Sequence, residues 1–173
     1  MRNGIGIERN HNGEVYVGNH KNDMREGRGV YHFPDKLEGD FKIFIIYMGH
    51  WQNNLKHGAG SYIWRKYNKT VDEIYENCIL TAFVGWFYED NMDVGMFYEE
   101  TVKDLTLYYG KFKNNKKNDE QGFFYNNSEE ETYVVICNIQ DNTVLEGIKF
   151  VFKHDEESNK NNFLNFHVFH FHI

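Results

Sequence analysis

The sequence predicts an all-β protein, an elongated and twisted antiparallel sheet built from stacked β-hairpins. Three observations support this fold class: a short pattern that recurs along the chain, polar turn residues inside each copy, and an aromatic composition. The chain holds 15 Phe, 12 Tyr and 3 Trp, and such residues favour strands because they pack well on a pleated surface. At 173 residues, one domain is expected.

The recurring pattern is an aromatic strand with a central glycine, followed by a strand with two glycines. Its two clear copies are Tyr16–His20 with Gly27–Tyr31, and Tyr47–Trp51 with Gly58–Tyr62. Alternate residues share a face of a strand, so the aromatic residues and glycines of each half point the same way. The connections at 21–26 and 52–57 are polar and carry Asn or Asp, which suits a tight turn. Each copy therefore predicts a hairpin.

The paired glycines suggest how the hairpins stack. Glycine has no side chain to pack, so two glycines on one face form a smooth floor. We expect the Tyr or Trp of a neighbouring hairpin to lie flat on this floor. Such contacts would join the hairpins into a continuous row.

At these residues the chain resembles the MORN repeat, whose pattern is Y-x-G-x-W-x-x-G-x-x-x-G-x-G followed by an aromatic residue and a turn. Residues Tyr47–Trp64 follow it closely, with Asn54 in place of the turn glycine. Asn also enters the left-handed region, so this replacement keeps the turn. Residues Tyr16–Asp35 fit with His20 in the Trp position and Asp23 in the turn position. The resemblance implies an array of stacked hairpins.

Further copies are degenerate. Gly95 and Gly122 are interpreted as single remnants of the glycine pairs. Four segments are interpreted as opening strands without a clear second strand: Leu37–Phe41, Phe83–Phe87, Tyr108–Phe112 and Leu145–Lys149. We expect the array over residues 1–152, clear over 4–64 and degenerate over 83–152, with roughly five or six hairpins. Residues 4–16 resemble the second half of a unit whose first strand is missing. Either the protein begins inside a repeat or its gene starts further upstream.

Other segments interrupt or follow this array. Thr70–Glu73 has the form of a helix capping box, which predicts a short helix over residues 70–78. Alternatively, the residues from Cys78 onwards form a strand that continues into the next unit. Residues 131–138 and 143–152 predict another hairpin. Residues 153–162 are a polar linker, and residues 163–173 form an aromatic and His-rich C-terminal strand or tail.

The tail raises a metal hypothesis. His170 and His172 would share one face of a strand, with His167 nearby, and imidazoles at this spacing can bind Zn²⁺ or Cu²⁺. No Cys or acidic residue close in sequence completes the ligand set, so a final strand with half-exposed histidines is favoured and no metal is predicted. Because an aromatic strand at a sheet edge invites pairing, we expect this tail to contact a partner.

Charge and motifs exclude several functions. The net charge is −7, which argues against nucleic acid because phosphates require a basic surface. The sequence has no phosphate-binding loop, no GxSxG and no HExxH motif, so we expect a non-enzyme without a cofactor. Cys78 and Cys137 lack CxxC spacing and are expected to be buried, reduced thiols. We expect an intracellular protein.

The resemblance implies a scaffold, because MORN proteins occur in cilia, axonemal radial spokes, parasite cytoskeletons and membrane junctions. We therefore expect a structural subunit of a large assembly, with the ciliary axoneme as its leading location and a homo-oligomer through open sheet edges as one option. Aromatic anchors dominate interface energetics. The exposed aromatic residues expected to bind the partner are Trp51, Trp86, Tyr109, Phe169 and Phe171.

The alternative is a peripheral membrane adaptor, since MORN arrays have been proposed to bind phosphoinositide head groups. This function requires a basic cluster. One turn region supplies it, with Lys111, Lys113, Lys116 and Lys117. A solvated hairpin tip explains the same residues, and the negative net charge opposes binding to anionic lipid.

Overall fold

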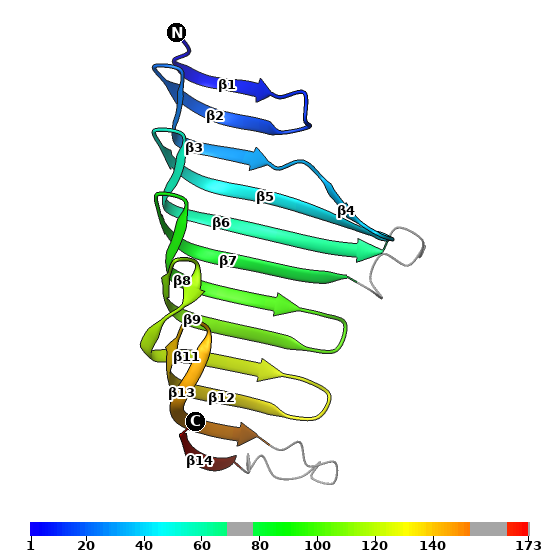
Figure 1. The fold of residues 1–173 in the computed structure, drawn as a ribbon, viewed down its shortest axis with the longest axis vertical. Helices are drawn as coiled ribbons and strands as arrows, with labels where there is room; N and C mark the ends of the chain where they lie inside the picture. Colours follow the sequence, from blue (N-terminus) through cyan, green and yellow to red (C-terminus); the bar gives the residue numbers. More distant parts are fainter. Residues whose placement is uncertain (69–77, 153–165, 173) are drawn as a thin grey trace, which may run out of the picture.

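The fold is one open antiparallel sheet of 14 strands with no helix in the described part of the chain (Figure 1). A computed structural model describes residues 1–68, 78–152 and 166–172. The strands follow one another across the sheet in chain order, except that short β4 lies beside β5 and short β10 beside β9. The strands are β1 (Gly4–Arg9), β2 (Val15–Lys21), β3 (Met24–His32), β4 (Lys36–Glu38), β5 (Phe41–Gln52), β6 (Leu55–Asn68), β7 (Ile79–Tyr88), β8 (Asn91–Glu100), β9 (Leu105–Lys113), β10 (Lys116–Lys117), β11 (Asp119–Asn127), β12 (Thr132–Gln140), β13 (Thr143–Phe152) and β14 (Phe166–His172).

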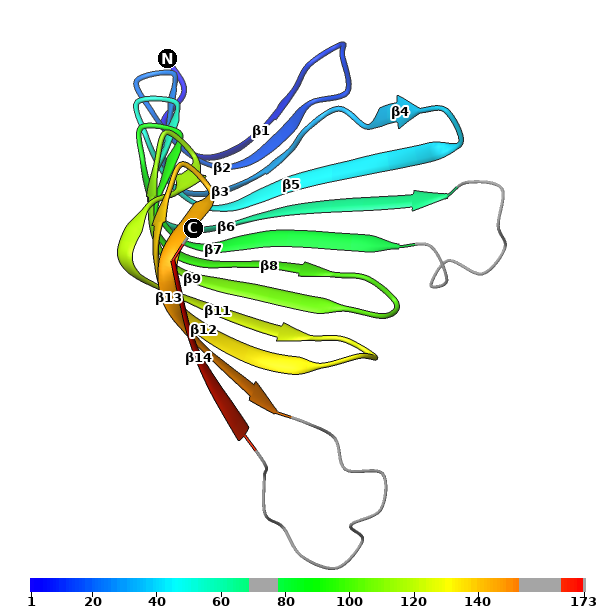
Figure 2. The same ribbon diagram turned by 60° about the horizontal axis from the view of Figure 1, so that its bottom comes forward.

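Five hairpins repeat along this sheet, namely β2–β3, β5–β6, β7–β8, β9–β11 and β12–β13, with β1 and β14 at the two edges. Figure 2 shows the strands fanning out as the sheet twists and bending near the hairpin turns. The all-β array and the hairpin at 131–152 are thus confirmed. The possible helix at 70–78 and the linker at 153–162 lie outside the described residues, apart from Cys78, which directly precedes β7.

Two of the expected opening strands were wrong. Leu37 belongs to β4, and Gly39 forms the following turn with a φ of +59°, so Leu37–Phe41 opens no unit. Leu145–Lys149 lies in β13, the second strand of its hairpin. Its opening strand is β12, where Cys137 occupies the glycine position and pairs with Gly147.

A continuous ladder of aromatic rings forms the core on one face of the sheet. The opening strands β2, β5, β7 and β9 each supply two rings four positions apart, and the rings meet edge to face with centroids 5.1 to 5.3 Å apart. Trp51, for example, contacts Tyr47 of its own strand and Tyr16 of the previous hairpin. Each such pair contributes about 1 kcal/mol beyond area burial. The ladder runs His20, Tyr16, Trp51, Tyr47, Phe87, Phe83, Phe112 and Tyr108.

The glycine floor exists, but the ring that covers it comes from the same hairpin and not from the neighbouring one. A Cβ added at Gly60 would lie 2.5 Å from the Tyr47 hydroxyl, and one at Gly49 would lie 2.6 Å from the Gly60 Cα. The Tyr47 hydroxyl donates a hydrogen bond to the His50 carbonyl at 2.9 Å, only three residues further on. Because a straight strand would carry that carbonyl out of reach, the strand bends around its own tyrosine.

The hairpin turns connect each unit to its neighbour. Each of five turns has two consecutive residues with positive φ, such as Asn53 at +51° and Asn54 at +71°. The Asn54 amide donates to the Arg25 carbonyl at 3.1 Å, and its side-chain oxygen accepts from the Arg25 amide at 2.7 Å. Asp23, Asp90 and Asn142 make the same two-point contact with Arg2, Lys56 and Lys117.

Gly49→Ala should destabilise the protein by about 2–3 kcal/mol, because the new Cβ meets paired backbone that cannot yield. Gly6→Ala is the matched control, since its Cβ would lie an ordinary 3.4 Å from His20 Nδ1; we expect a change below about 1 kcal/mol. Urea unfolding measures both. Equal effects of the two substitutions would contradict the close ring packing.

Asn54→Gly should cost about 1 kcal/mol, because glycine keeps the turn but loses the hydrogen bond to the Arg25 amide. Asn53→Gly is the control at the adjacent turn position, where the backbone amide donates to Glu26 and the side chain has no hydrogen bond to another described residue. Glycine adopts positive φ without strain, so stability should stay equal or rise slightly. The free energy of unfolding in urea checks both, and a larger loss for Asn53→Gly would contradict the role of Asn54.

Candidate functional site

The two faces of the sheet have different characters. The aromatic face carries the ring ladder, and Tyr16, Tyr47, Phe83 and Tyr108 are each 0% exposed. We call the opposite side the outer face. It carries the alternate residues of each strand, such as Val17 beside Tyr16 and Met48 beside Tyr47. Among the described residues no helix or second sheet covers either face.

A largely apolar line of side chains, with Ser61 and His170 as its polar members, crosses the outer face from one sheet edge to the other. Its members pair successively across twelve strands, and we call them the outer row: Ile7, Val17, Val30, Met48, Ser61, Val84, Met96, Tyr109, Phe123, Ile136, Ile148 and His170. Several stay open to solvent; Val84 is 43% exposed and Tyr109 56%. Exposed apolar patches of this extent mark binding surfaces.

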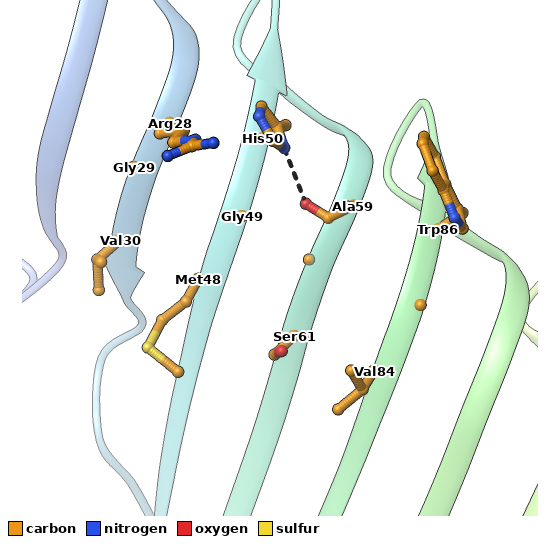
Figure 3. A pocket seen from close by; sticks show the side chains of 12 residues that line it. Arg28, Gly29, Val30, Met48, Gly49, His50, Ala59, Ser61, Val84 and Trp86 are labelled. Atoms are coloured by element: carbon orange, nitrogen blue, oxygen red, sulfur yellow. Dashed lines mark hydrogen bonds between the residues drawn. The ribbon is translucent and has the colours of Figure 1, made fainter.

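The outer row borders an open hollow of about 670 Å³ over β3, β5, β6 and β7. Figure 3 shows Val30, Met48, Ser61 and Val84 along one side, and Arg28, His50, Ala59 and Trp86 along the other. His50 Nδ1 lies 3.3 Å from the Ala59 carbonyl oxygen. The bend of each strand toward its tyrosine spreads these two lines apart on the outer face. The small residues of β6 deepen the gap between them.

Of the three aromatic anchors expected near the strand openings, two are exposed. Trp86 is 58% exposed and Tyr109 56%, both on the outer face. Trp51 is 5% exposed because it belongs to the ring ladder, so its expected exposure was wrong. The alternation of side chains along a strand carries a signal for this difference: Trp51 lies two residues after Gly49 and shares its face, whereas Trp86 and Tyr109 lie directly beside Gly85 and Gly110 and point to the opposite face.

The tail forms strand β14 and pairs with β13 at the sheet edge. Phe169 is 52% exposed, whereas Phe171 packs half-buried against the aromatic core. His167 lies near the Phe169 ring, at a centroid distance of 6.3 Å, while His170 continues the outer row. These two histidines therefore point to opposite faces. No group of three potential metal ligands occurs among the described residues.

The lysine cluster divides between the two faces. Lys113 and Lys116 are paired across the β9–β10 turn, and Lys111 lies on the same outer side as Lys113. Lys117 instead points to the aromatic face, where its ammonium lies about 5 Å from the Phe97, Tyr108 and Phe124 ring centroids. Burial there lowers the pKa of Lys117. A lipid site could therefore use only the first three.

Arg25, Glu8 and His20 form a charged cluster at the first hairpin, which the repeat pattern did not predict. Arg25 bridges to Glu8 at 2.6 Å and lies over the Tyr31 ring at 4.5 Å. Burial opposes the charge of Glu8, but hydrogen bonds and attraction from Arg25 and Arg2 outweigh it and lower the pKa of Glu8. His20 lies nearby, with Nε2 3.6 Å from the Glu8 carboxylate. The contacts among these groups indicate a structural role.

The two cysteines and the absence of a membrane-spanning helix among the described residues complete the description of the site. Cys78 and Cys137 are free thiols; Cys137 is buried, and burial raises its pKa, whereas Cys78 is half-buried. A search of the described segments for a helix long and apolar enough to cross a bilayer finds none.

Comparison with known proteins supports the repeat assignment. The family model of the MORN repeat matches residues 16–37 and 47–69. These segments cover hairpin β2–β3 and most of hairpin β5–β6. No curated protein matches the chain. The chain therefore contains MORN repeats over these two segments, and repeats of this family suggest binding to proteins or membrane lipids.

Proposed function

We propose that this protein is a non-catalytic scaffold, an assembly subunit that binds partner proteins through its extended sheet. The observation that carries this proposal is the outer row, a largely apolar line across twelve strands. A soluble sheet exposing so long an apolar line normally buries it against another element. In the described part of the chain no such element is present, so a partner is the natural source of the second layer.

The construction of the array suits a scaffold. The ring ladder and the turn contacts connect neighbouring hairpins, with two-point contacts at turns such as those of Asn54 and Asp90. Stability in such repeats is approximately the sum of unit and neighbour terms, so the array can remain rigid along its length. A rigid, elongated platform holds partner groups at set spacing, which is what an assembly subunit needs.

The larger assembly is proposed to be ciliary, axonemal or otherwise cytoskeletal, and the protein intracellular. This finer assignment rests on the resemblance to MORN proteins of those structures. The edge strand β14 is proposed as a second contact, since β14 is the last strand of the sheet in the described part of the chain and its Phe169 is exposed. Pairing at this edge with a partner strand, or with another copy, would extend the sheet.

Affinity purification of the tagged full chain from its own organism, followed by mass spectrometry, tests the scaffold. We expect axonemal or cytoskeletal proteins, and at least a tenfold lower yield of one of them with Phe169→Lys, because a cation at the edge opposes strand pairing. Leu37→Lys, at a residue 65% exposed on β4, is the control and should retain them. Recovery of the protein alone would contradict the scaffold.

A membrane adaptor is the second candidate, favoured by one observation. Lys111, Lys113 and Lys116 project from the outer side of β9 and β10, and none forms an ion pair with another described residue. Each lysine near an anionic membrane contributes about 1 kcal/mol, so three give measurable but salt-sensitive binding.

Sedimentation with phosphatidylserine or phosphoinositide vesicles tests this second function. If it is correct, the triple change of Lys111, Lys113 and Lys116 to Glu should abolish binding, and Lys117→Met should leave it unchanged because that ammonium lies on the aromatic face. Circular dichroism checks that both variants fold. Wild-type protein that stays in the supernatant at low salt would eliminate the adaptor.

A further inference from the structure

We propose that the outer face binds an acidic amphipathic α-helix of a partner protein, which lies across the strands along the outer row. This inference rests on the proposed scaffold function and names the chemistry of one partner segment. It is carried by three observations: the largely apolar outer row, the hollow on β3 to β7, and the cations beside them.

A helix suits this face because the backbone of the sheet is already used. Every strand from β2 to β13 on the main path of the sheet has a hydrogen-bonded neighbour on each side. An occupant lying on the face therefore gains no backbone hydrogen bonds from the sheet and must satisfy its own. A helix does so, and it is about 10 Å wide.

The dimensions of the row also match a helix. The row crosses twelve strands, which are spaced about 4.8 Å apart, so it is roughly 50 Å long. A helix rises 1.5 Å per residue, so about 35 residues would span the row, and a shorter helix would cover part of it. Apolar side chains at positions i, i+3, i+4 and i+7 would face the row.

The hollow supplies a place for an anchor residue of this helix. Met48 and Val84 stand on either side of Ser61, and Trp86 stands beside Ala59. A Leu, Met or Phe side chain from the helix would fill the space over Ser61 and Ala59 (Figure 3). Anchors that enter such hollows usually contribute most of the binding energy.

Charge favours an acidic helix. Arg28 is exposed beside the hollow, and Lys111 and Lys113 follow on the turn side of the outer row. Among the described residues these three cations have no ion-pair partner. Glutamates along one flank of the helix would lie opposite them, which steers association and fixes the direction of the helix.

Other occupants fit less well. A bilayer is flat, whereas neighbouring strands of a twisted sheet rotate by about 20° each, so a membrane could touch only part of the row. Figure 2 shows this rotation as a fan of strands. A second copy would present the same cations on its own outer face, and each copy carries a net charge of −7. A helix is only about 10 Å wide, so it contacts the row along a line, and it can supply the missing acidic groups.

The test uses the full chain and a fluorescein-labelled synthetic 35-residue peptide, with Leu on one helical face and Glu along its flanks. Two control peptides have the same Leu and Glu in permuted order, or Lys in place of Glu. Fluorescence anisotropy measures the Kd. We expect micromolar binding of the amphipathic acidic peptide, and at least tenfold weaker binding of both controls.

Matched variants locate the site. Val84→Glu, in the outer row, should weaken binding at least tenfold, whereas Val102→Glu, at a residue 63% exposed in the β8–β9 turn, should change it less than twofold. Arg28→Glu should weaken binding of the acidic peptide and strengthen that of the Lys peptide. Both valines are solvent-exposed, so the variants should keep the wild-type circular dichroism.

Several results would overturn the inference. These are equal affinity for the permuted peptide, equal affinity of the two valine variants, or no binding at millimolar peptide. Binding to phosphatidylserine vesicles that Val84→Glu abolishes would assign the face to a membrane. A dimer in sedimentation velocity that Val84→Glu dissociates would assign it to a second copy. If no acidic peptide binds while assembly proteins still co-purify with the wild-type chain, the helix site is wrong while the scaffold function stands.

Discussion

The structure depends on a close approach between a tyrosine ring and the glycines of its own hairpin. A Cβ at Gly29 or Gly60 would collide with the ring of Tyr16 or Tyr47. Because the glycines leave room, each strand bends around its ring, and the Tyr16 and Tyr47 hydroxyls reach carbonyls three residues ahead. The bend makes the aromatic face a core that one layer of sheet can close.

The same bend shapes the opposite face. As the strands curve toward their tyrosines, the outer side chains on either side of the glycines spread apart, and the hollow lined by Met48, Val84 and Trp86 results. The core and the hollow on the outer face are therefore two consequences of one packing constraint. The turn contacts add rigidity, since residues such as Asn54 and Asp90 hold the preceding hairpin at two points.

The repeat pattern predicted the hairpins, their order and most strand positions, because the glycine spacing directly encodes the ring packing. It failed where other residues take the same positions. In β12, Val135, Cys137 and Ile139 stand where other units have an aromatic residue, a glycine and an aromatic residue. The pattern also did not predict that each ring covers the glycines of its own hairpin rather than those of the neighbouring hairpin, because it does not specify which hairpin a ring covers.

The candidate surface was only partly predictable for a similar reason. Sequence alternation places Trp86 and Tyr109 away from the core, but it places Trp51 with the core, since Trp51 shares its face with Tyr47. The outer row becomes visible only with the strand register, because its members are separated by irregular turns and bulges. The separation of Lys117 from the other lysines likewise follows from the short strand β10 and its pairing.

The central claim, that buried tyrosine rings hold the array together, is tested most directly by following tyrosine ionisation at 295 nm and circular dichroism through an alkaline titration. Burial raises the pKa of Tyr16 and Tyr62 to about 12 and raises those of Tyr31, Tyr47 and Tyr108 as well. Since the folded state holds these protons more tightly than the unfolded state, stability is fully present below pH 10 and falls as the pH rises toward 12. The account predicts that these five of the 12 tyrosines ionise late, together with loss of the sheet. Ionisation of all tyrosines near pH 10 with the sheet intact would contradict it.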